Sequence, residues 1–219
     1  GSGTPQQLTE GFSVMLTGLS WAPDGQRLAF TDKNGKLFVL TLADRKVVEV
    51  ADDAYGPLED HAWSPDGKWL AFTLKNANRN PSLYLWRATD GQLTRVTDDL
   101  FPIMSPTWDP EGHYLYVLSR RDYAPLLSNL EFDFAGTRNV GIFALLLQKT
   151  TPHPFPPEND EVTGDKESPK SEPKTDSKGV PPTVRIDLDG LSRRIVRVPV
   201  SADNLRALEA IKGHLLYLR

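Results

Sequence analysis

The sequence predicts an all-β protein that forms part of a β-propeller. A five-residue motif, Trp-x-Pro-Asp/Glu-Gly, occurs at residues 21–25, 63–67 and 108–112, so that its tryptophans lie 42 and 45 residues apart. A short apolar run follows each copy, and no comparable helical stretch interrupts the series. A repeat of about 40–50 residues is typical of propellers, in which each repeat forms one four-stranded blade.

Each motif predicts a tight turn between the first two strands of a blade. Proline presets φ for a β-turn, the acidic residue can bond its own backbone, and glycine adopts positive φ without a steric clash. The tryptophan is expected to end the strand before the turn. The runs after it are rich in aromatic and branched residues, which favours strands at 28–30, 69–72 and 114–118.

A second pair of strands is predicted in each of the first two units. Asn-Gly and Asp-Gly between alternating apolar runs indicate hairpins. In the first unit Asn34-Gly35 precedes a strand at 36–40. In the second unit Asp90-Gly91 follows a strand at 83–86. The closing strands are expected at 47–50 and 93–96.

The whole chain, 1–219, is therefore predicted to be an incomplete propeller of about three four-stranded blades plus parts of two others. Closed propellers typically have about four to eight blades, so we expect a sector of a larger ring. The blades are expected at 14–52, 57–99 and 103–200, and further terminal strands at 4–10 and 205–219.

The third blade contains an insertion that breaks the strand pattern. A proline-rich stretch at 151–157 favours an extended polyproline conformation. The residues after it are almost all polar, and such a segment buries too little apolar surface to offset its ordering entropy. We expect 157–181 to be a disordered surface loop. Order is expected to resume at 184–188, where apolar residues alternate, and at 194–198.

Composition narrows the possible partners. The 219 residues are 39% hydrophobic and carry a net charge of −4, with both signs mixed along the chain. Because no basic stripe stands out, binding to nucleic acid is not expected. No apolar run reaches the roughly 18–20 residues that would span a membrane. Cysteine is absent, which excludes disulfides and zinc–cysteine sites. We expect a cytoplasmic protein without cofactors.

No catalytic or metal-binding motif appears in the sequence. There is no Gly-x-Ser-x-Gly elbow, glycine-rich phosphate loop or His-Glu-x-x-His pair. The four histidines have no histidine partner at ligand spacing, so we expect structural or solvated roles for them: His61, His113, His153 and His214. The sequence therefore predicts no catalytic, cofactor-binding or metal-ligating residue.

Acidic pairs occur at Asp52-Asp53, Glu59-Asp60 and Asp98-Asp99, and the first and last of these fall at equivalent ends of successive blades. A rim of acidic groups that holds a cation is one interpretation. Loop solubility and protection of sheet edges is the preferred one.

Two adjacent arginines, Arg120 and Arg121, are the only candidate peptide contacts in the sequence. A guanidinium can pair with a peptide carboxylate through two parallel hydrogen bonds. A salt bridge at a blade edge is the simpler alternative and is preferred. The repeated tryptophans are expected to pack between neighbouring blades.

The motifs resemble those of known propeller families. Trp-x-Pro-Asp/Glu-Gly followed by Leu-Ala-Phe is similar to the repeat of TolB-type propellers and of many peptidase propellers. A more specific resemblance, to the second propeller of tricorn-type proteases and their bacterial homologues, rests on ordered segments along the chain. These segments lie at 115–123, 129–134, 151–155, 158–162 and 185–191.

The resemblance implies a non-catalytic segment of a large serine protease. That family combines two propellers, a PDZ-like module and a serine-peptidase domain that holds the active serine downstream. We expect this chain to act as a scaffold and a peptide passage, with peptide substrates and the other protease domains as partners. Open blade edges predict self-association. The alternatives are a TolB-like protein–protein interaction module and a propeller attached to a prolyl-oligopeptidase-type hydrolase.

Overall fold

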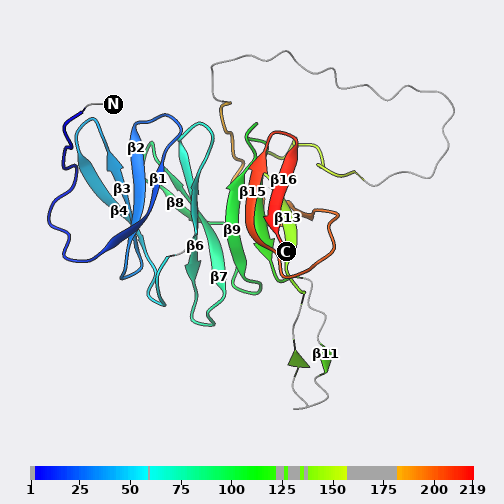
Figure 1. Cartoon of the computed structure of the whole chain (residues 1–219). Helices are drawn as coiled ribbons and strands as arrows, with labels where there is room; N and C mark the ends of the chain where they lie inside the picture. Colours follow the sequence, from blue (N-terminus) through cyan, green and yellow to red (C-terminus); the bar gives the residue numbers. More distant parts are fainter. Residues whose placement is uncertain (1–2, 59, 122–125, 128–133, 136–137, 157–181) are drawn as a thin grey trace.

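The computed structural model confirms an all-β propeller architecture. It describes residues 3–219 except 59, 122–125, 128–133, 136–137 and 157–181. The described residues form three four-stranded antiparallel sheets and two two-stranded ones. Figure 1 shows the three four-stranded sheets side by side in chain order, from the N-terminal blue strands to the green ones, with the C-terminal red hairpin beside the last of them.

The first two sheets, blade 1 and blade 2, are simple meanders in which consecutive strands pair. Blade 1 contains β1 (Leu16–Trp21), β2 (Arg27–Asp32), β3 (Lys36–Thr41) and β4 (Lys46–Asp52). Blade 2 contains β5 (His61–Trp63), β6 (Trp69–Lys75), β7 (Pro81–Arg87) and β8 (Leu93–Arg95). In both blades the motif glycine takes positive φ, 66° at Gly25 and 67° at Gly67, as the predicted turn requires.

Blade 3 has the same strand order but long connections. It contains β9 (Ile103–Trp108), β10 (Tyr114–Ser119), β13 (Gly141–Leu146) and β14 (Ile195–Arg197). A hairpin of β11 (Leu126–Leu127) and β12 (Phe134–Ala135) lies between β10 and β13. A short 3-10 helix, η1 (Leu191–Arg193), precedes β14. Strand β13 was not predicted from the sequence, because it is a continuous apolar run and lacks the alternation that identifies half-buried strands.

A C-terminal hairpin of β15 (Arg206–Ile211) and β16 (His214–Leu218) packs beside blade 3, where β15 lies next to β9. Apolar clusters fill the space between successive sheets. Ala29 and Val39 of blade 1 pack with Leu70 and Phe72 of blade 2. Further clusters lie between blades 2 and 3, and between blade 3 and the hairpin. This face-to-face packing sets each blade's first strand beside that of the next.

Two segments that were expected to be strands are not. Residues 4–10 form no strand, since no described strand lies beside them to complete a ladder. Leu8 and Phe12 instead pack on the outer face of blade 1, against Phe30 and Phe38. Residues 184–188 form no strand either, and Val184 packs into the core between blades 2 and 3. The predicted disordered loop, 157–181, lies outside the described residues.

Candidate functional site

The repeated tryptophan joins the first strand of each blade to that of the blade before it. Trp63 Nε1 donates a hydrogen bond to the Ser20 carbonyl oxygen at 3.3 Å, and Trp108 Nε1 donates one to the Ala62 carbonyl oxygen at 3.0 Å. Each acceptor directly precedes the tryptophan of the previous blade. The first strands of the three blades and of the C-terminal hairpin, β1, β5, β9 and β15, are here called the inner strands. The indole hydrogen bond therefore fixes both the distance and the relative shift along the strand between neighbouring inner strands of the blades.

Inner strands β1, β9 and β15 share a second feature, a β-bulge near their beginning. The bulge residues adopt positive φ, 61° at Gly18, 48° at Ser105 and 51° at Ala207, and strand pairing shifts register at each of them. Gly18 and Ser105 each lie three residues before the motif tryptophan. Because a bulge bends its strand and redirects the side chains around it, this device shapes the inner edge of the propeller.

The four inner strands line an open cavity of about 450 Å³, here called the axial cavity. Three consecutive residues at each strand line it, at 18–20, 60–62, 105–107 and 207–209, and of these Asp60 directly precedes β5. These include the bulge residues of β1, β9 and β15. Residues separated by almost the whole chain therefore meet at one place, which makes this cavity the candidate functional site.

Asp60 and His61 are the titratable groups that blade 2 contributes to this cavity. Asp60 Oδ2 accepts a hydrogen bond from the Ser105 backbone N–H at 2.8 Å and so ties blade 2 to the bulge of blade 3. Neither ring nitrogen of His61 has a hydrogen-bond partner among the described residues. Burial lowers the pKa of His61, and the Gly18 backbone and the Asp60 carboxylate offset this only in part. The imidazole is therefore neutral at neutral pH.

Gly18 is required beside this imidazole. A Cβ at Gly18 would lie 3.1 Å from His61 Cε1 and 3.0 Å from Thr31 Oγ1, in addition to the strain of positive φ. The glycine therefore lets β1 and β5 approach closely at the wall of the cavity.

The described residues contain no group of three or more His, Asp or Glu that could hold a metal ion. Of the other histidines, His113 is exposed and lies 3.8 Å from Asp109. His153 Nδ1 accepts the Phe155 backbone N–H at 3.0 Å, and His214 is exposed at the start of β16. Only His61 of the four lines the axial cavity.

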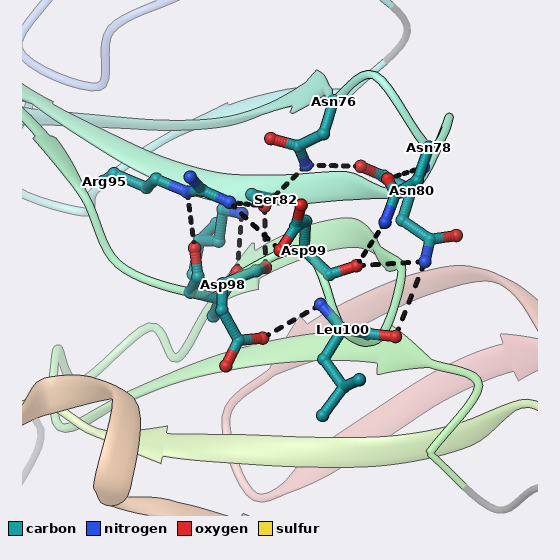
Figure 2. Close-up of polar contacts among 10 residues, drawn as sticks. Asn76, Asn78, Asn80, Ser82, Arg95, Asp98, Asp99 and Leu100 are labelled. Atoms are coloured by element: carbon teal, nitrogen blue, oxygen red, sulfur yellow. Dashed lines mark hydrogen bonds and ion pairs between the residues drawn. The ribbon is translucent and has the colours of Figure 1, made fainter.

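The acidic pair Asp98-Asp99 belongs to the joint between blades 2 and 3, as Figure 2 shows. Asp98 Oδ1 accepts the Leu100 backbone N–H at 3.1 Å. The Asp99 carbonyl oxygen accepts side-chain amides from the β6–β7 turn, at 2.9 Å from Asn78 and 3.0 Å from Asn80. Each of these bonds joins a main-chain group to a side-chain group, and together they hold the connection from β8 to blade 3.

Asp52-Asp53 has a related role between blades 1 and 2. Asp53 is buried, and its carboxylate accepts the backbone N–H groups of Tyr55 at 2.9 Å and Lys75 at 3.1 Å. Asp52 lies 3.9 Å from Lys36. In both joints the aspartate carboxylate accepts the backbone N–H of the residue two positions later, Tyr55 for Asp53 and Leu100 for Asp98. This spacing is the sequence signal for the role. In the third acidic pair, Glu59 lies outside the described residues.

The predicted peptide contacts, Arg120 and Arg121, do not line the axial cavity. The Arg121 guanidinium lies over the rings of Phe101 and Phe143, 5.3 Å and 5.8 Å from their centroids. Burial lowers the pKa of Arg121, and the Asp98 carboxylate opposes this effect. Arg120 is exposed. Peptide contact by either arginine stays a prediction.

A second cavity, of about 500 Å³, separates blade 3 from the C-terminal hairpin. Tyr114 and Tyr116 line it, and the Tyr114 hydroxyl donates to the Pro152 carbonyl oxygen at 2.9 Å. Burial raises the pKa of Tyr116 to about 12, so this phenol stays protonated. This second cavity lies between two sheets, whereas the axial cavity is lined by residues from the three blades and the C-terminal hairpin.

Comparison with known proteins gives consistent matches. Residues 1–219 match the family described as the tricorn protease second beta propeller domain. Tricorn protease homolog 1 from Streptomyces coelicolor is 32% identical over 219 residues, which cover 99% of this chain. A protein described as a tricorn-like protease C-terminal subunit, from Sulfurisphaera tokodaii, is 26% identical over 128 residues, or 58% of this chain.

The fold comparison agrees with the sequence matches. A crystal structure of the tricorn protease superposes with a TM-score of 0.73 at 13% identity and covers 92% of this chain and 19% of that one. The chain spans 20% of the Streptomyces relative and 13% of the Sulfurisphaera relative. The described residues contain no helix with the length and apolarity needed to cross a bilayer.

Proposed function

The chain belongs to the family of tricorn protease second β-propeller domains, and on this premise we propose that it is a non-catalytic scaffold and peptide passage for a tricorn-like serine protease. Peptide hydrolysis takes place in another domain of that protease. The axial cavity is where the peptide passes. A cytoplasmic location stays a prediction of the sequence.

The observation that carries this proposal is the convergence of four inner strands on one cavity. The indole hydrogen bonds join β1 to β5 and β5 to β9, and the Thr107 hydroxyl of β9 donates to the Leu208 carbonyl oxygen of β15 at 2.8 Å. The bulges of β1, β9 and β15 keep three-residue segments facing the cavity. Its wall combines backbone with small, polar and apolar side chains. Such a wall can bind extended peptides of different sequence, because it can contact the peptide backbone, which all of them share.

Peptide binding at the cavity is tested with an obstructed variant. Leu19 lines the cavity and is 68% exposed, so Leu19→Trp narrows the opening without disturbing buried packing. Leu93, on the outer strand β8 and 43% exposed, supplies the matched control Leu93→Trp. Fluorescence anisotropy with a labelled extended peptide should show weakened binding for Leu19→Trp alone. Equal binding by both variants, or no saturable binding by the parent chain, would refute the passage.

The absence of catalysis is tested separately. Incubation of the purified chain with fluorogenic peptides should give no turnover above buffer, because the proposal assigns hydrolysis to another domain. Robust hydrolysis that copurifies with the chain would overturn the assignment.

We also propose that the isolated chain self-associates through its two open ends. Trp21 is 58% exposed on the face of blade 1 that points away from blade 2, whereas Trp63 and Trp108 are buried against a preceding blade. At the opposite end, the hairpin exposes Leu216 and Leu218, at 49% and 55%. A head-to-tail contact would place the Trp21 face of one copy on the hairpin of another.

Light scattering over a concentration series tests this association. The mean mass should rise with concentration, and Trp21→Glu should keep the chain monomeric because it places a charge on the apolar end. Leu93→Glu, on an outer strand away from both ends, should associate like the parent chain. A parent chain that stays monomeric at high concentration would contradict the proposal.

A further inference from the structure

We propose that the axial cavity selects peptides by positive charge, binding the ammonium or guanidinium groups that they carry. This inference rests on the proposed passage and adds its substrate class. The structure provides three grounds: the sign of the charges on the cavity wall, the open oxygen of Asp60, and apolar wall beside the carboxylates.

Every formally charged side chain that lines the cavity is a carboxylate. Asp60 comes from the start of blade 2 and Glu209 from β15, and no lysine or arginine is among the lining residues. The remaining titratable group, His61, is neutral at neutral pH and does not offset these charges. A recess lined by one sign of charge concentrates its field and attracts the opposite charge.

The two carboxylates are open to a ligand. Asp60 Oδ2 is engaged by the Ser105 N–H, but Oδ1 accepts no hydrogen bond from any described residue. Glu209 is exposed and forms no ion pair with a described side chain. Asp60 directly precedes β5 and Glu209 lies on β15, so two separate sheets each present one carboxylate to a cationic group of the peptide.

The wall beside these carboxylates is suited to the stem of a basic side chain. Leu19 presents exposed apolar surface at the cavity, and the largely buried Pro106 and Leu208 form part of the same wall. The aliphatic part of a lysine or arginine packs on such surface while its charged end reaches a carboxylate. An acidic peptide of the same length gains the packing but meets like charge.

The experiment measures binding of three peptides of one length and one uncharged label, which differ only in carrying two Lys, two Gln or two Glu. Anisotropy titrations of the full chain should show the Lys peptide bound roughly fivefold more tightly than the Gln peptide, the order of magnitude for two partly exposed ion pairs. The Glu peptide should bind most weakly. The differences should shrink at high salt, which screens charges at this exposure. Acetylated and free N-termini separate a contribution of the terminal ammonium from that of the side chains.

Variants locate the effect. Asp60→Asn keeps an oxygen for the Ser105 N–H and removes the charge, and Glu209→Gln changes an exposed side chain whose loss does not threaten folding. Together they should abolish the preference for Lys, and Glu209→Gln alone should reduce it. Asp44→Asn with Glu49→Gln removes the same charge at the outer edge of blade 1 and should leave the preference intact.

The outcomes distinguish the two proposals. If all three peptides bind equally and Leu19→Trp still weakens them, the passage stands and selection by charge is refuted. If the preference for Lys survives in the double cavity variant, the assigned residues are wrong. If no peptide binds saturably, the passage itself falls.

Discussion

The tryptophan corners of blades 1 and 2 carry nearly the same sequence but lie in opposite environments. Trp63 is 8% exposed, and its indole donates to the Ser20 carbonyl oxygen of the blade before it. Trp21 occupies the same place in its own turn and is 58% exposed, because no described blade precedes it. The motif thus specifies the turn, and the neighbouring blade determines whether its tryptophan is buried.

The residue after the tryptophan shows the same division of roles. It is Ala22 in blade 1 and Ser64 in blade 2, and both are buried. Ser64 Oγ accepts the Trp69 backbone N–H at 2.9 Å and donates to Asp66 at 2.7 Å. In blade 1 no hydroxyl takes part, and the Asp24 carboxylate accepts the Gln26 N–H at 2.9 Å and the Arg27 guanidinium at 3.1 Å. The turn of blade 2, which lies between two other blades, therefore includes a buried serine hydroxyl that the turn of blade 1 does not have.

The largest predicted effect tests the burial difference directly. Trp108→Ala removes a buried indole from the joint between blades 2 and 3, and we expect it to lower the free energy of unfolding by about 3–5 kcal/mol. Trp21→Ala removes the same side chain from the open end and should change it by less than about 1 kcal/mol. Urea denaturation followed by circular dichroism measures both. Comparable losses would show that the repeat position, rather than the neighbouring blade, determines the contribution.

The next effect concerns the turn of blade 2. Ser64→Ala leaves the buried N–H of Trp69 without its acceptor, at a cost of about 1–3 kcal/mol. Ala22→Ser in blade 1 places a hydroxyl at the equivalent position and shows what the residue type contributes by itself. A stability of Ser64→Ala within error of the parent chain would mean that the hydroxyl bond is dispensable.

The repeat and its turns were predictable because local chemistry determines them. Proline, an acid and glycine in succession specify the turn wherever they occur, and the period identified the blade. The predicted burial of the tryptophans between blades is correct for Trp63 and Trp108, which have a preceding blade. For Trp21, which is 58% exposed, the same expectation is wrong in this structure, since no described blade packs against this corner.

The axial cavity was not predictable in the same way. Gly18, Ser105 and Ala207 share no residue type, so the bulge that relates them leaves little sequence signal. Asp60 was noticed only as one member of an acidic pair, and His61 was assigned no role at the site. These residues meet because four sheets are arranged around one cavity. The spacing of motifs along the chain does not predict which residues of distant strands come together there.

A smaller effect isolates the indole N–H from the bulk of the ring. Trp63→Phe keeps most of the apolar surface but removes the donor to the Ser20 carbonyl oxygen, so we expect a loss of about 0.5–1.5 kcal/mol beyond that of Trp21→Phe. Equilibrium denaturation of the two variants under one set of conditions gives this difference. If the two variants lose the same free energy of unfolding, packing of the ring alone stabilises the joint and the indole hydrogen bond contributes nothing.

The smallest effect lies at the inner strands, where blades 1, 2 and 3 carry Leu19, His61 and Pro106, each two residues before the motif tryptophan. Because burial lowers the pKa of His61, the unfolded chain binds a proton there at a higher pH than the folded chain does. The stability contributed by the neutral imidazole is complete above pH 6.5, the ordinary pKa of histidine, and is lost as pH falls below it. His61→Gln should therefore lose stability less steeply than the parent chain below pH 6.5, with His214→Gln, which removes an exposed imidazole, as the baseline. If the stability of His61→Gln falls with pH as steeply as that of the parent chain, the imidazole has no part in the acid sensitivity. Blade 2 would then differ from blades 1 and 3 at this position only in the shape of its side chain.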